Sequence, residues 1–440
     1  MIYIGVFYMM AKNLVNIKNF TNNKIQTQNS IFCIINILLI SYITISSIFP
    51  PLRVLTPSAI INAICMAFWL MLTFLYSMGF YINATVQRFL TILFIIYSFL
   101  VPYIFGNVTV GNRYLGIAPI FFLYIVYEYN NYIGQPQNNF NIIKITIPFA
   151  LITLIITGTG LRQNPLLSRS IKSSGEYSVN LLKRGIAGYE FIYFLVLLFP
   201  IIMYITFFSS ITKKRYQKCL LILCCILIFS VIILSNYFTA LIVSLSSLLI
   251  MIIVRVTKKN KPIAMIVGLI LICIFVIIGK EIVLFILDWM ATWVGNSLTL
   301  QRIYEMKYSI IFGNDSIVNT NRWDLMRVSI NSFLNNSIIG IIANPKINFL
   351  DFYTGTGQHS HFIDTFAFLG LLPGLMQIYI VVQPYFKRLK QGFANDLILA
   401  VLYSIIMIFT FNTVTPSMGI VTGLLLPMLY DALKQKDKVN

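Results

Sequence analysis

Long apolar runs recur along almost the whole of this 440-residue chain, and they constrain its fold more than any other feature. About 20 apolar residues are enough to cross a bilayer as an α-helix, which satisfies its own backbone hydrogen bonds there. Only 10% of the residues are charged, whereas soluble domains carry about 25%. Because the runs do not alternate between apolar and polar residues, a transmembrane β-barrel is excluded. We therefore expect an all-α, polytopic membrane protein, with residues 1–440 forming a single integral membrane domain.

Hydropathy predicts twelve membrane spans, some of them shorter than a straight crossing needs. In chain order they are 31–50, 59–81, 87–105, 114–129, 141–158, 189–209, 219–235, 237–254, 262–279, 362–384, 396–412 and 415–431. Residues 1–30 are a polar stretch without the cleavage site of a signal peptide, and we expect them to form a cytoplasmic tail. Two long segments remain between the spans, a first external loop at 159–188 and a main external loop at 280–361.

Basic residues are spread unevenly between the two sides that these spans define. The chain has 32 Lys and Arg against 13 Asp and Glu. With the N-terminus inside, nineteen basic residues fall in cytoplasmic segments, including the clusters at 213–218, 255–261 and 387–390, and two fall in short external loops. Cytoplasmic loops are enriched in this way in membrane proteins. We therefore expect both termini in the cytoplasm and interpret the clusters as topology anchors, with no role in binding nucleic acid.

The other eleven basic residues lie in the two long external segments, on the side that the same rule disfavours. The segment 159–188 carries Arg162, Arg169 and Arg184 together with two lysines and one acid. Two interpretations remain open. The segment is either a solvated loop that touches lipid headgroups, or part of a site for an anionic ligand such as a diphosphate, which Arg binds through bidentate hydrogen bonds.

The main external loop, 280–361, contains a predicted helix with two arginines. Asn321 is suited to cap a helix in which apolar residues recur at helical spacing. That helix carries Arg322 and Arg327, and Gly340 follows its end.

Both histidines of the chain, His359 and His361, stand together at the end of this loop after a glycine-rich run, 354–357. Ser360 between them can cap the next helix. A helix N-terminus offers free N–H groups to a phosphate, and a histidine can take a proton from a hydroxyl. Capping and packing are the alternative roles. Because histidines at i and i+2 do not share a helix face and no carboxylate is spaced as a third ligand, we expect no metal.

These motifs resemble the O-antigen polymerase and O-antigen ligase superfamily of membrane glycosyltransferases, of the GT-C class. Ligases of that group carry a His, then Asn, Ser or Gln, nine residues, a Gly, and three positions later a Gly, Thr or Tyr. Here His359 and Ser360 are followed by nine residues and Gly370, while Pro373 occupies the last position. Arg322 matches the arginine that opens an amphipathic helix upstream in the family.

The resemblance implies a sugar transfer at the external face of a bacterial cytoplasmic membrane, without a metal or other cofactor. The donor would be a glycan on undecaprenyl diphosphate. Arg322 and Arg327, with Arg162, Arg169 or Arg184, would hold the diphosphate. His359 would position or deprotonate the acceptor hydroxyl, and His361 would share or take that role.

Three functions remain open at this stage. The first is a polymerase of repeat units for an O-antigen or a capsule, with a chain-length regulator and a flippase as potential partners. The second is a ligase that attaches a finished glycan to another acceptor. The third is a flippase or other transporter of lipid-linked oligosaccharide, for which the long segment 280–361 and the lack of charged residues within the spans are unusual.

Overall fold

A computed structural model shows that the chain is an all-helical, multi-pass membrane protein. It describes residues 30–56, 58–164, 167–171, 175–209, 214–235, 237–259, 320–343 and 355–437, and scattered residues between 281 and 308. The expected tail at 1–30 lies outside these ranges except for its last residue, as does the whole of the predicted span 262–279. Within some described helices the side chains are not described, among them those of Arg169 and Arg322.

The described residues form eighteen α-helices and three short helices of other types. The α-helices are α2 (Ser30–Ile48), α3 (Pro50–Leu55), α4 (Ser58–Tyr76), α5 (Met78–Ile82), α6 (Val86–Ile104), α7 (Val108–Ile117), α8 (Pro119–Tyr132), α9 (Gln137–Gln163), α10 (Leu167–Ser170), α11 (Glu176–Lys183), α12 (Tyr189–Met203), α13 (Arg215–Leu234), α14 (Phe238–Lys259), α17 (Thr320–Asn335), α18 (His361–Leu369), α19 (Leu371–Leu389), α20 (Asn395–Phe411) and α21 (Leu426–Asp437). The others are the π-helices η1 (Tyr204–Phe208) and η3 (Ile420–Leu425) and the 3₁₀-helix η2 (Ile341–Ala343).

Seven described segments are long and apolar enough to cross a membrane: α2, α4, α6, α9, α12 with η1, α13 and α14. The number is eight if α7 and α8, which meet at 43°, form one broken span. The helix α20 is apolar but shorter. The structure therefore supports a multi-pass membrane protein and does not confirm the predicted count of twelve.

The predicted span 362–384 is not one continuous helix. It is divided into α18 and α19 at Gly370, whose φ of +88° cannot be accommodated inside an α-helix. The nine-residue α18 is not among the candidate spans. The segment 159–188, expected as a loop, begins within the last turns of α9 and contains the short helices α10 and α11.

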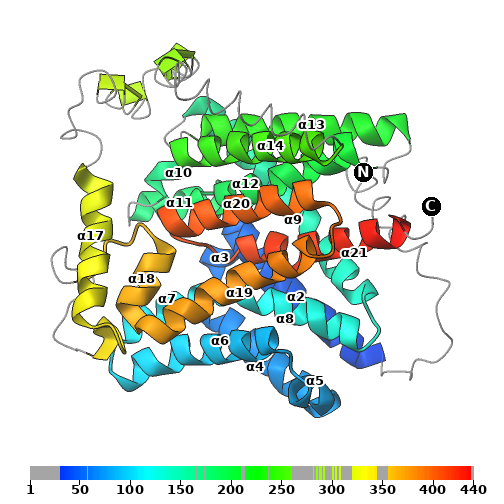
Figure 1. Cartoon of the computed structure of the whole chain (residues 1–440), viewed down its shortest axis with the longest axis vertical. Helices are drawn as coiled ribbons and strands as arrows, with labels where there is room; N and C mark the ends of the chain where they lie inside the picture. Colours follow the sequence, from blue (N-terminus) through cyan, green and yellow to red (C-terminus); the bar gives the residue numbers. More distant parts are fainter. Residues whose placement is uncertain are drawn as a thin grey trace.

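Most of the long helices run roughly parallel in a bundle, and α17 lies across one end of it (Figure 1). We call this the α17 end; α10, α11 and α18 lie at it too. At the opposite end α2 begins and α21 ends, and the basic residues Arg215, Lys387 and Arg388 occupy helix termini there.

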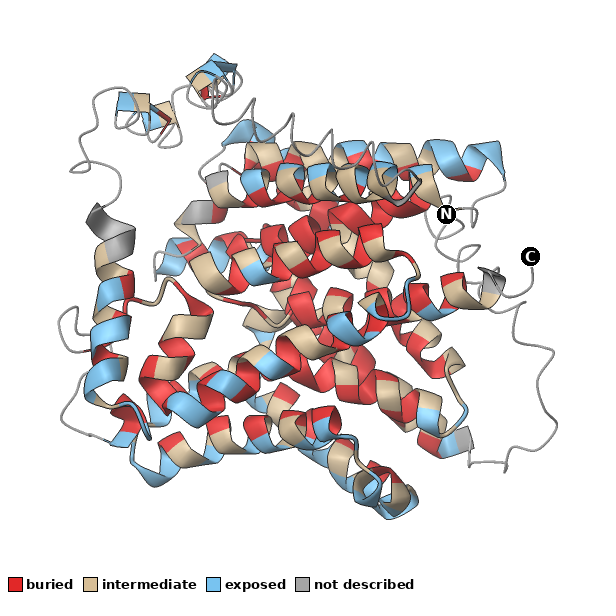
Figure 2. Cartoon of the chain, in the orientation of Figure 1, coloured by how far each residue is buried: buried red, intermediate tan, exposed pale blue. Residues whose placement is uncertain are grey.

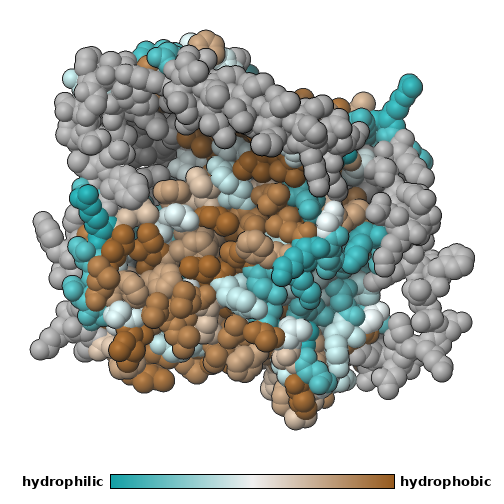
Figure 3. Space-filling view, viewed as in Figure 1, coloured by the Kyte–Doolittle hydropathy of each residue, from teal (hydrophilic) through white to brown (hydrophobic). Residues whose placement is uncertain are grey.

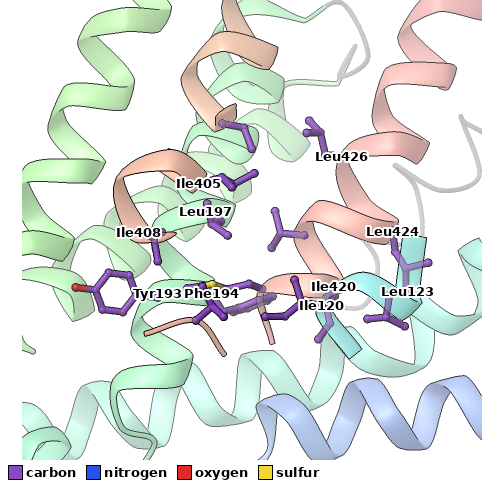
Figure 4. Packing of buried hydrophobic residues seen from close by; sticks show 14 of the residues in the cluster. Ile120, Leu123, Tyr193, Phe194, Leu197, Ile405, Ile408, Ile420, Leu424 and Leu426 are labelled. Carbon is purple, nitrogen blue, oxygen red and sulfur yellow. The ribbon is translucent and has the colours of Figure 1, made fainter. Parts of the chain in front are cut away.

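The core lies where α8, α12, α20 and η3 meet, and buried residues are concentrated there (Figure 2). Figure 4 shows Leu197, Ile405 and Ile420 from three of these elements packed within it. Gly419 and Gly423, four residues apart, let η3 approach the backbone of α8, because a Cβ at either glycine would meet α8 at less than 3.0 Å. Small residues at this spacing bring membrane helices together in the same way.

Hydrophobic side chains cover much of the face formed by α6, α18 and α19, and hydrophilic ones gather at α17 and around the ends of α19 and α21 (Figure 3). Exposed apolar side chains of these helices include Phe89 and Leu93 of α6 and Leu372 of α19, all at least 40% exposed. Exposed apolar surface of this extent fits contact with lipid, since soluble monomers rarely carry it.

Candidate functional site

The loop 355–360 packs against α17 and leads into α18, which begins at His361. Gly357 makes this contact possible, because a Cβ there would collide with the backbone of Leu325 in α17. Ser332 of α17 donates a hydrogen bond of 2.6 Å to the carbonyl of Gly355. This loop, which carries His359 and leads into His361 and which we call the histidine loop, is therefore held against α17 at one end of the bundle (Figure 1).

Ser329 of α17 connects this loop to α18. Its hydroxyl accepts a hydrogen bond from the backbone N–H of Gly357 at 2.9 Å and donates one to Oδ1 of Asp364 at 2.7 Å. Ser329 and Asp364 are each only 1% exposed. One buried hydroxyl thus ties α17, the loop and α18 together.

Asp364 lies in the first turn of α18 and faces Arg113 of α7. Its Oδ2 is 3.7 Å from an Arg113 guanidinium nitrogen, and that guanidinium also lies over the ring of Phe368. Burial raises the pKa of Asp364 from 3.8 to about 6, although Arg113 and the hydrogen bond from Ser329 oppose the change. A largely buried ion pair between Asp364 and Arg113 therefore lies next to the loop that carries His359.

His361, the first residue of α18, points into the protein interior and is 2% exposed. Its Nε2 is 2.8 Å from Nε2 of Gln377 in α19, and its backbone N–H donates to the carbonyl of Asn412. Its ring also lies near those of Tyr114 and Phe409. Burial, and secondarily the charge of Arg113, lower its pKa well below the ordinary value of 6.5. His361 is therefore set up to remain neutral and to link α18 to α19 and the chain after α20.

His359 has a different environment, because it lies two residues earlier in the loop and is partly exposed. Gln358 before it has a φ of +55°, and Ser360 after it caps α18 by accepting a hydrogen bond from the N–H of Ile363 at 3.3 Å. The predicted cap at Ser360 is confirmed. Of the two histidines, only His359 is placed where a ligand at the α17 end can reach it.

The five arginines expected to bind an anion lie on four elements or their ends. Arg327 of α17 is 75% exposed at its side chain, with Asp324 at 3.8 Å. Arg322 lies in the first turn of α17, and its side chain is outside the description.

In the first external segment, Arg162 lies in the last turn of α9 and Arg184 directly follows α11; both are exposed. Arg169 lies in α10, with its side chain outside the description. The principal contacts of α10 are with α9 and α11, and those of α11 are with α3. Arg327 is thus on the helix that packs against the histidine loop, but on the opposite face from Leu325 and Ser329, which contact it. Arg162 and Arg184 lie at the same end of the bundle on separate elements (Figure 1).

Sequence reasoning missed Arg113, Ser329 and Gln377. From the sequence, Arg113 is only one of two basic residues in short external loops. Ser329 lies in a helix that the sequence marks by its arginines, and nothing marks the serine itself. Asp364 stands five residues after His359, but nothing local shows that it pairs with a residue about 250 positions earlier. Only the tertiary packing of α7, α17 and α18 joins these groups.

Replacing Asp364 tests this buried network. We expect Asp364→Ala to lower the free energy of unfolding by about 3 kcal/mol, because it leaves Arg113 and Ser329 without their acceptor. Asp364→Asn should cost much less, since the amide oxygen still accepts from Ser329. Thermal unfolding of the purified protein in detergent micelles, followed by tryptophan fluorescence, measures both changes.

The pH dependence provides a second readout. Because the folded carboxyl has the higher pKa, it binds a proton more tightly than the unfolded one, so this group's stabilisation is complete below pH about 4 and is lost as pH rises to about 6. Wild type should lose stability relative to Asp364→Asn across that interval. If the stability of the two proteins changes with pH by the same amount across this interval, Asp364 does not have the raised pKa described above.

Among the described residues, no three His, Cys, Asp or Glu side chains gather closely enough to hold a metal ion. The polar groups that do gather here are suited to position a loop and to bind a ligand through hydrogen bonds and arginine charge.

No family model and no curated protein matches the chain.

Proposed function

We propose that the protein is a polymerase that joins oligosaccharide repeat units carried on undecaprenyl diphosphate into a surface polysaccharide. The reaction would take place at the external face of a bacterial cytoplasmic membrane. In this account the α17 end faces outward, both termini are cytoplasmic, and the remaining apolar segments complete twelve spans.

The observation that carries the proposal is the position of His359. It is partly exposed on a loop that packs against α17, a helix with two arginines at one end of an apolar bundle. A lipid-linked substrate needs this combination. Its polyprenyl chain stays in the bilayer beside the bundle, while its diphosphate and sugars lie at the membrane surface where α17 is located. Arginine is suited to the diphosphate because its planar guanidinium forms paired hydrogen bonds with phosphate oxygens.

The reaction follows from these positions. The acceptor hydroxyl oxygen attacks the anomeric carbon of the donor glycan as its proton passes to the imidazole of His359. The bond between the anomeric carbon and the diphosphate oxygen breaks, and the diphosphate leaves with the electron pair. Arg322 and Arg327, assisted by Arg162, Arg169 or Arg184, stabilise the growing negative charge. Asp364, Ser329 and His361 keep the loop in place.

Deleting the gene in its host tests the proposal, with the lipid-linked glycans extracted and resolved by size. We expect single repeat units to accumulate on undecaprenyl diphosphate at the outer face, and long chains to return when the wild-type gene is restored. Long chains retained on the lipid carrier would instead indicate a ligase. Single units confined to the cytoplasmic face, protected from a glycosidase added to intact spheroplasts, would indicate a flippase.

A further inference from the structure

A cavity inside the bundle has a lining unlike that of the site at the α17 end. The cavity is small, about 40 Å³, which is room for a few water-sized groups or for the end of a longer molecule. It is formed by α6, α8, α19, α20 and η3, and its lining residues are Gln87, Ile120, Phe121, Tyr124, Ile380, Val381, Pro384, Tyr385, Ile405, Phe409 and Thr422. Seven of these are aliphatic, aromatic hydrocarbon or proline side chains, and none is charged.

Two lining residues hold buried polar atoms for which the described part of the chain provides no hydrogen-bond partner, Oε1 of Gln87 and the hydroxyl of Tyr385. Gln87 is 4% exposed and Tyr385 is 3% exposed. An unpaired polar atom at such a depth is costly, so it normally has a protein, water or ligand partner.

The orientation of Gln87 has a clear cause. Pro384 has no N–H, so the carbonyl of Ile380, four residues earlier in α19, lacks its usual helical donor. Nε2 of Gln87 supplies that donor at 2.8 Å. The amide nitrogen is thereby occupied, and the oxygen remains as an acceptor.

The cations nearby are already engaged. Arg88 is paired with Glu128 at 3.0 Å, and Arg388 donates to the carbonyl of Pro384 at 3.1 Å. Neither lines the cavity. The lining itself offers no charged group to an anion, and burying an anion without an adjacent opposite charge is strongly disfavoured.

We propose that this cavity binds the hydroxyl end of a neutral, alcohol-headed lipid, with the carbon next to the hydroxyl against the apolar lining and the rest of the chain outside the cavity. A hydroxyl is both a donor and an acceptor. It can donate to Oε1 of Gln87 or accept from the hydroxyl of Tyr385, so it can supply the partner that either atom lacks. The inference concerns a second site and does not depend on the polymerase proposal.

Photolabelling of the purified protein in detergent tests the inference. The probes are a photoreactive long-chain primary alcohol and the photoreactive hydrocarbon of the same length, and labelled peptides are identified by mass spectrometry. We expect the alcohol to label the lining segments in preference to the hydrocarbon. Tyr385→Phe removes one hydroxyl and should weaken alcohol binding about five- to tenfold, the effect of one lost hydrogen bond. The matched control is Tyr379→Phe, on the same helix at a 38% exposed residue outside the lining.

A second variant keeps the test decisive if Tyr385→Phe does not fold. Thr422→Phe places a ring at a partly exposed lining residue and should block labelling by both probes. Equal labelling by the alcohol and the hydrocarbon, or an unchanged affinity in Tyr385→Phe, would overturn the proposal. So would the absence of label in the lining segments, which would mean that the cavity holds water only.

Discussion

His359→Ala should lower polysaccharide formation by about 10²- to 10⁴-fold, the range expected when a general base is removed. The physical reason is its place on the loop between α17 and α18, where it is partly exposed while His361 is buried. The measurement is the size distribution of the glycan made in cells deleted for the gene and complemented with the variant, at matched membrane levels.

His359→Asn separates the two roles open to this residue. Asparagine can still hydrogen-bond to an acceptor hydroxyl but cannot take its proton at neutral pH. If His359 only positions the acceptor, His359→Asn should retain much of the activity that His359→Ala loses. If it accepts the proton, both variants should be inactive. A normal ladder of chain lengths in His359→Ala would remove this residue from the mechanism.

Gly370→Ala should prevent assembly of the site and greatly lower the yield of folded protein. Gly370 has a φ of +88°, and a Cβ there would collide with the backbone carbonyl of Ile338, in the turn that follows α17. In that same turn Ser337 accepts a hydrogen bond from the N–H of Leu371 at 2.8 Å. Backbone cannot move aside as a flexible side chain can, so we expect a loss of at least about 3 kcal/mol. Folded yield and melting temperature after detergent extraction measure it.

Gly106→Ala is the matched control for the effect of positive φ. Gly106 has a φ of +75°, but an added Cβ there would have nothing within 4 Å. This variant should therefore cost only about 1 kcal/mol, the penalty of a left-handed conformation for a residue with a side chain. Similar melting temperatures for the two variants would show that α17 and α18 are not packed through Gly370.

Much of the fold could be predicted because helix formation and apolar runs are local properties. The spans expected at 31–50, 59–81 and 87–105 correspond to α2, α4 and α6. The cap at Ser360 is observed, and so is the helix expected after Asn321, although it begins at Thr320 and therefore includes the residue predicted to cap it. In each case the signal lies within a few residues of the feature, as caps and hydrophobic periodicity require.

The parts that could not be predicted depend on contacts between distant residues. The break at Gly370 follows from a close backbone approach to the turn after α17, which hydropathy does not register. The pairing of Arg113 with Asp364 joins α7 to α18. Similarly, buried Asn36 of α2 accepts one hydrogen bond from Trp69 and donates one to Asn130. These bonds link three helices through residues that no sequence motif singles out.

Reconstitution with a lipid-linked substrate tests the central claim most directly. Single repeat units on undecaprenyl diphosphate, extracted from the deletion strain, would be incorporated into liposomes with the purified protein and with EDTA present. The account predicts a ladder of longer glycans and the release of one undecaprenyl diphosphate for each new glycosidic bond. Single units that remain unjoined, while folded protein moves them between leaflets or transfers them to another acceptor, would contradict it.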